Sequence, residues 1–203
     1  MATEAQTVLK DIAFIKALVE RGGQSDAKGG GLLIGVGSLC GAASLFHWSV
    51  QNDLLALPME SARLGWIAAV VLCVILAAAL NARTPLRTAP DNVYRAARRG
   101  IVMAIAVLWA VLGVAAWRFH NPNLMELAVP MVFALGGGFW VIFSSVQERN
   151  QLRWVPVGDF AAAVGLAFLL GSQHLYLANA LALFALFVVP GIVLRRRVSL
   201  AMA

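Results

Sequence analysis

Residues 31–50 read GLLIGVGSLCGAASLFHWSV, which is twenty consecutive residues without a charged side chain. A helix of this length, rising ~1.5 Å per residue, spans the ~30 Å hydrocarbon core of a lipid bilayer. Further apolar runs follow along the rest of the chain and require the same explanation. Together they predict an all-α, polytopic membrane protein with six transmembrane helices, at residues 31–50, 64–82, 100–118, 124–146, 157–173 and 175–194.

The composition agrees with a membrane protein. The chain has 203 residues, of which 61% are hydrophobic and 13% are charged, whereas soluble domains carry about 25% charged residues. The formal net charge of +6 could indicate a nucleic-acid-binding protein. However, the basic residues lie in short clusters between the apolar runs, which is the pattern of topology signals. We therefore expect no nucleic-acid partner.

The basic residues also predict the orientation. Fourteen of the sixteen Lys and Arg residues fall on one side of the predicted membrane, and only Arg63 and Arg118 fall on the other. Connections rich in Lys and Arg stay in the cytoplasm. Both termini are therefore expected in the cytoplasm, with the protein in the plasma (inner) membrane. The outer connections are then residues 51–63, 119–123 and 173–175.

An amphipathic helix is predicted before the first span, over residues 3–22. One face of this helix is apolar, and the remaining faces carry equal numbers of acidic and basic side chains. Membrane-surface helices, in contrast, usually have a cationic polar face. A protein surface is therefore favoured: the protein's own cytoplasmic side, a separate partner or a second copy. The glycine-rich sequence GGQSDAKGG links this helix to the bundle, so residues 1–30 form one unit and 31–203 the other. The apolar docking stripe is Val8, Ile12, Ile15 and Val19.

Small residues predict close packing between helices. The first span contains two GxxxG pairs, a spacing that lets helix backbones approach closely. A triple glycine at residues 136–138 follows Pro130 in the fourth span, and Pro190 lies in the sixth. Each proline is a site where a helix is expected to kink or loosen. The predicted packing glycines are Gly31, Gly35, Gly37 and Gly41.

Three charged residues lie inside or at the edge of the predicted spans, where a charge is costly. Arg118 ends the third span and Glu126 begins the fourth, so a short turn allows an interfacial ion pair between them. Asp159 lies in the first turn of the fifth span, where a helix N-terminus favours an anion. A structural role is expected for Asp159, paired with Arg149 or Arg153.

All three histidines fall on the predicted outer side: His47, His120 and His174. Converging imidazoles could bind a metal or haem, or take up protons. Their spacing places no two of them on the same helix face, so no metal or other cofactor is expected. Cys40 and Cys73 lie inside apolar runs without metal-type spacing, and they are interpreted as small hydrophobic residues.

The most basic connection is residues 83–99, RTPLRTAPDNVYRAARR. Basic side chains at the depth of lipid headgroups contribute ~1 kcal/mol each to contact with anionic lipids. Anionic headgroups are therefore the expected partner of Arg83, Arg87, Arg95, Arg98 and Arg99.

No catalytic motif such as GxSxG, HExxH or a Walker A sequence is present. The sequence therefore favours a non-enzymatic regulatory, sensor or accessory subunit that acts through its cytoplasmic helix at residues 3–22. A small-solute or ion transporter is the first alternative, which would require a polar path across the bilayer. A metal or haem protein that uses the outer histidines is the second.

Overall fold

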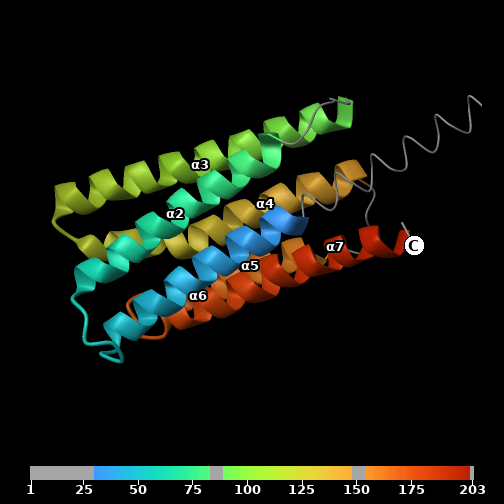
Figure 1. The fold of residues 1–203 in the computed structure, drawn as a ribbon. Coiled ribbons are helices and arrows are strands. Elements are labelled where there is room, and N and C mark those ends of the chain that lie inside the picture. The colour runs from blue at the N-terminus through green and yellow to red at the C-terminus, as the bar shows by residue number, and fades with distance from the viewer. Residues whose placement is uncertain (1–29, 83–88, 148–153, 202–203) are drawn as a thin grey trace, which may run out of the picture.

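The structure is a computed structural model that describes residues 30–82, 89–147 and 154–201. These residues are almost entirely helical, with no strand in those ranges. The predicted N-terminal stripe, Val8 to Val19, lies outside them. The described elements are the helix Gly30–Gln51 (blue and unlabelled in Figure 1), α2 Met59–Ala82, α3 Ala89–Phe119, η1 Pro122–Leu127, α4 Ala128–Gln147, α5 Trp154–Phe168, α6 Leu175–Leu183, η3 Phe184–Val188 and α7 Val189–Ala201.

Five helical stretches are long and apolar enough to cross a membrane, compared with the six predicted. The exception is α5, Trp154–Phe168, whose 15 residues reach about 22 Å at 1.5 Å per residue. The prediction placed this span at residues 157–173. The helix instead starts earlier and ends at Phe168, because the following residues turn back through Gly171, which has a φ of 75°. The stretches that qualify are Gly30–Gln51, Met59–Leu80, Arg99–Phe119, Pro122–Ile142 and Leu175–Arg196.

The helices run side by side as an elongated bundle with three turns at one end (Figure 1). We call this the loop end; the other, where Gly30 and the end of α7 lie, is the terminal end. Each loop-end turn contains one residue in the left-handed backbone region: Asp53 at φ 53°, His120 at φ 51° and Gly171 at φ 75°. That region favours glycine. The Gly171 N–H also donates to Glu126 Oε2 at 2.9 Å, which connects two of the turns.

The two prolines named in the sequence behave differently. Pro130 is the third residue of α4, where its missing N–H removes no bond from the helix interior. The helix then continues without a break through the glycines at 136–138. Pro190 instead follows the π-helical segment η3, Phe184–Val188. Because Pro190 cannot donate to the carbonyl of Leu186, the helix widens there.

Glycines bring the helix Gly30–Gln51 against the antiparallel segment Leu175–Ala201. A Cβ placed on Gly37 would lie 2.7 Å from Phe187 Cβ, and one on Gly41 would lie 2.9 Å from the ring of Phe184. A Cβ at either position would force a neighbouring atom to shift. Gly37 lies against the backbone of Val188, which cannot easily move aside, whereas Gly41 lies against the end of the Phe184 side chain. Gly31 has open space around it and lies outside this seam.

The same helix contacts α2 with a different face. Gly35 packs against Leu76, and a Cβ on Gly65 would lie 2.8 Å from the ring of Phe46. Apart from this contact stripe, α2 and α3 together carry half of the exposed large apolar side chains of the described chain. Exposed apolar helices of this kind are suited to contact with lipid. Both helices lie along the outside of the bundle in Figure 1.

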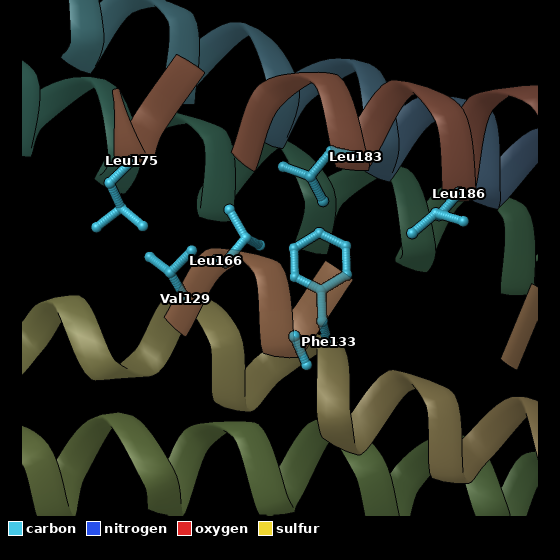
Figure 2. Close-up of a cluster of buried hydrophobic side chains, with 7 residues drawn as sticks. Val129, Phe133, Leu166, Leu175, Leu183 and Leu186 are labelled. Atoms are coloured by element: carbon cyan, nitrogen blue, oxygen red, sulfur yellow. The ribbon is translucent and has the colours of Figure 1, made fainter. Parts of the chain in front are cut away.

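Two groups of apolar side chains form the interior. The first lies between α4, α5, α6 and η3, and we call it the core cluster; six of its seven residues are labelled in Figure 2. The second, the terminal cluster, lies nearer the terminal end and consists of Trp140, Val155 and Leu194, with Leu33 packed against it. The core cluster consists of Val129, Phe133, Ala163, Leu166, Leu175, Leu183 and Leu186.

The glycine seam predicts a difference between two otherwise equal substitutions in one helix. Gly37→Ala forces a methyl group into Phe187, so we expect destabilisation of about 1–3 kcal/mol, typical of overpacking. Gly31→Ala adds the same methyl group in open space and is expected to be neutral or stabilising by up to ~1 kcal/mol. Thermal unfolding of both variants in the same detergent measures the difference. Equal melting temperatures for the two variants would contradict the close contact between Gly37 and Phe187.

Candidate functional site

Asp159 is the ionisable residue of the described core. It lies in α5, and its side chain is 0% exposed. Both carboxylate oxygens are buried, and neither has a hydrogen-bond partner in the described part of the chain. No charged group acts on it there either. Arg149 and Arg153, the partners expected from the sequence, lie outside the described residues.

The two apolar clusters enclose Asp159 along the helix axis. Val155, one turn earlier in α5, belongs to the terminal cluster, and Ala163, one turn later, belongs to the core cluster. The facing residue on α4 is Gly136, where an added Cβ would lie 3.3 Å from Asp159 Oδ2. Because glycine has no side chain, α4 offers the carboxyl group neither a hydrogen-bond partner nor a charge at this level. Apolar side chains of the two clusters therefore lie on either side of the carboxyl group along the helix axis.

This position has a definite chemical consequence. An isolated carboxylate in an apolar surrounding costs far more free energy than a neutral group, and even a neutral polar group costs about 1–3 kcal/mol without a hydrogen bond. Such a group persists in a folded protein only when something neutralises it, or when its cost serves a function. The site therefore holds either a proton or a charge that the bundle must accommodate.

A second polar site lies further toward the loop end, and its side chains are hydrogen-bonded to one another. The Asn179 amide Nδ2 donates to Ser44 Oγ at 2.8 Å, and that hydroxyl donates to the carbonyl oxygen of Tyr176 at 2.7 Å. Leu183 and Leu186, which follow Asn179 by one and two turns, belong to the core cluster (Figure 2). This apolar layer therefore separates the Ser44–Asn179 pair from the level of Asp159.

His47 is held in one tautomer by its neighbours. The indole Nε1 of Trp66 donates to His47 Nδ1 at 3.1 Å, and the imidazole stacks on Tyr176 with ring centroids 3.6 Å apart. Because an indole N–H can only donate, neutral His47 must carry its own proton on Nε2. Neither ring nitrogen then has a free lone pair for a metal ion. The arrangement gives His47 a packing and hydrogen-bonding role.

The other two histidines have separate surroundings. His120 Nδ1 lies 2.8 Å from the carbonyl oxygen of Trp117, and His174 Nε2 lies 3.4 Å from the amide nitrogen of Gln173. Both histidines are exposed at the loop end. Nowhere in the described ranges do three His, Cys, Asp or Glu side chains gather in a way that could hold a metal ion. The structure does not bring the three candidate histidines together.

The predicted ion pair between Arg118 and Glu126 is not formed in the described part of the chain. The Glu126 carboxylate instead accepts the hydrogen bond from the backbone of Gly171. Glu126 lies in the 3₁₀ segment Pro122–Leu127 rather than in the first turn of an α-helix. This segment directs the side chain toward the turn between α5 and α6, which the sequence could not place beside it.

The remaining predicted residues fall into two groups. Among the glycines, Gly35, Gly37 and Gly41 pack against other helices of the same chain, and Gly31 does not. The basic residues of the 83–99 connection are only partly described, and their contact with lipid stays a prediction. Arg99 is exposed, Arg95 and Arg98 lie on α3, and Arg83 and Arg87 are outside the described residues.

Sequence reasoning missed two contacts between residues far apart in the chain. Ser44 bonds Asn179, and Cys40 Sγ lies 4.0 Å from Cys73 Sγ. The available signal was that polar or sulfur side chains occur inside apolar spans, which does not reveal their partners. The chain matches no family model, no curated protein and no solved structure.

The Ser44 hydroxyl gives a testable contrast within one helix. Ser44→Ala leaves the Asn179 amide buried without its acceptor, so we expect destabilisation of about 1–3 kcal/mol. Ser49→Ala is the matched control, because Ser49 Oγ bonds only the carbonyl of Leu45 in its own helix. Ser49→Ala is expected to change the free energy of unfolding by no more than about 0.5 kcal/mol. The melting temperatures of the two variants measure this difference. An equal decrease in both would contradict the hydrogen bond between Asn179 and Ser44.

Proposed function

We propose that this chain is a non-enzymatic, multi-pass protein of the plasma (inner) membrane that works as a proton-responsive sensor or regulatory subunit. The observation that carries the proposal is the unpartnered, fully buried carboxyl group of Asp159. An ionisable residue inside a membrane bundle is costly to insert and marks a functional position by default. The topology that accompanies this proposal has six crossings and both termini in the cytoplasm.

A proton suits the site better than a metal ion does. Ca²⁺ and Mg²⁺ require about six oxygen ligands, and no group of three ligand side chains gathers in the described part of the chain. One proton, in contrast, makes the carboxyl group neutral without any other ligand. Within the described ranges, no titratable side chain faces Asp159 from α4 or from the segment Leu175–Ala201, so this response would belong to Asp159 itself.

Loss of that proton has a mechanical consequence. It leaves a negative charge between the core cluster and the terminal cluster, opposite Gly136. The charge is stabilised only if water or a cation reaches it, which requires α4 and α5 to separate. The neutral and charged forms therefore favour closed and opened packing respectively, and such a two-state element is what a switch needs.

The output of the proposed switch is a change in what the N-terminal helix, residues 3–22, contacts. The apolar stripe of residues 3–22 needs a surface, and we assign it contact with a protein partner or with a second copy. A change in helix packing would alter the surface available to this stripe. The transporter alternative is less well supported, because the apolar core cluster lies between Asp159 and the polar Ser44–Asn179 pair.

Asp159→Asn tests the proposed proton response, because an amide is similar in shape but does not ionise. The thermal stability of the parent in detergent should fall as the pH rises from mildly acidic to mildly alkaline, since alkali leaves the buried charge. The stability of Asp159→Asn should change much less over the same range. The difference between the two titrations isolates the contribution of this one carboxyl group.

Glu126→Gln serves as the matched control, since it removes a carboxyl group that is partly exposed at the loop end. This variant is expected to keep the pH dependence of the parent. Parallel titration curves for the parent and Asp159→Asn would overturn the proposal. So would loss of the pH dependence in Glu126→Gln alone.

A further inference from the structure

Cys40 and Cys73 face one another across two antiparallel helices. Along this interface Gly35 packs on Leu76, and nearer the loop end Trp66 hydrogen-bonds His47. The two cysteines lie between these contacts, with their Sγ atoms 4.0 Å apart. Both are free thiols and both are partly buried. The register of the helix pair therefore fixes a dithiol that is separated by 33 residues in the sequence.

We propose that Cys40 and Cys73 are an oxidisable dithiol whose disulfide ties α2 to the helix Gly30–Gln51. Formation of the bond removes one hydrogen from each thiol, which releases two protons and two electrons and leaves a single S–S bond. A lipid-soluble quinone is the class of oxidant that accepts both electrons and both protons, and it becomes a quinol. Thiol–disulfide exchange with a reducing dithiol reverses the step.

The position of the pair selects this class of oxidant. Cys40 lies ten residues after Gly30 and eleven before Gln51, so it is about 15 Å from either end of its helix. An oxidant confined to water would not reach that depth in a bilayer. Both thiols are only partly buried and therefore remain open to a molecule dissolved among the acyl chains.

The surrounding packing allows the bond to close. A disulfide requires a sulfur separation of ~2.05 Å, so the thiols must approach by about 2 Å through rotation of their side chains and a small shift of α2. The neighbouring interface contains Gly35, Gly65 and Ala69, which keep the two backbones close. Most of the remaining surface of α2 is exposed, so a shift of α2 disturbs few other contacts.

A metal ion fits this pair less well than a disulfide. A structural zinc site takes four ligands, whereas no third His, Cys, Asp or Glu joins the cysteines in the described part of the chain. The disulfide needs nothing beyond the two thiols. Its consequence is also specific: the bond would fix α2, which has few buried side chains, to the helix at the glycine seam.

The test uses the full-length protein in its membranes, treated with a lipid-soluble benzoquinone whose ring carbons are all substituted, so that thiols cannot add to the ring. Free thiols are counted with a maleimide, and the bond is located by peptide mass spectrometry without reduction. We expect loss of both thiols, a Cys40–Cys73 bond within one chain, and full recovery with dithiothreitol. The oxidised protein should melt at a higher temperature than the reduced protein.

The matched control moves one thiol by a single residue, combining Cys73→Ser with Val74→Cys. Val74 is 63% exposed, so the new thiol lies on another face of α2, away from Cys40. This variant, checked for parent-like helix content by circular dichroism, should keep both thiols. The proposal is overturned if the parent keeps its thiols, if the bond joins two chains, or if the control oxidises to the same extent.

Discussion

The burial of one carboxyl group between two apolar clusters is the constraint on which this account of the bundle depends. Asp159 has no partner in the described chain, and its facing residue on α4 is a glycine. The other buried polar side chains of the described core, Ser44 and Asn179, are hydrogen-bonded to one another, and Ser44 also donates to the carbonyl oxygen of Tyr176. The level of the Ser44–Asn179 pair therefore has internal hydrogen bonds, whereas the level of Asp159 holds a carboxyl group without a partner in the described chain. That contrast supports the proposal that Asp159 is a functional position.

Besides the large side chains of the core cluster, glycines allow the helices to approach one another closely. Gly37 and Gly41 let the helix Gly30–Gln51 touch the segment Leu175–Ala201, and Gly158 admits Leu186 in the same way, where an added Cβ would lie 2.5 Å from the leucine. Leu186 belongs to the π-helical segment before Pro190. Asp159 therefore adjoins a place where the helical hydrogen-bond pattern already changes, and π-segments of this kind are frequent at functional sites.

Much of the fold could be predicted from the sequence, because length and hydropathy alone decide which segments can span a bilayer. The first span, the glycine packing at Gly35, Gly37 and Gly41, and the disturbance near Pro190 follow from local pattern. The end of α5 did not, because the apolar run continues past Phe168 while the backbone turns at Gly171. Hydropathy reports which residues prefer an apolar surrounding but does not report where a helix ends.

The candidate site was harder to predict than the fold. The sequence showed that a charged residue, Asp159, lies in an apolar run, where a charge is energetically costly. It did not show which residues face Asp159, because Gly136 comes near it only through the packing of α4 on α5. The sequence predicted Arg118 as the partner of Glu126, but it could not show that the backbone of Gly171, from a distant turn, donates a hydrogen bond to Glu126. Partners across helices depend on rotation about each helix axis, and a single sequence constrains that rotation weakly.

Infrared difference spectroscopy tests the central claim most directly, because a protonated carboxyl group and a carboxylate absorb at different frequencies. The spectrum of Asp159→Asn is subtracted from that of the parent in the same lipid or detergent, at several pH values. The account predicts a protonated-carboxyl band at mildly acidic pH, where exposed aspartates with a pKa of about 3.9 are already ionised. That band should decline as the pH is raised. A difference spectrum that contains only carboxylate absorption at every pH would contradict the account, because it would mean that Asp159 is permanently ionised and has a partner.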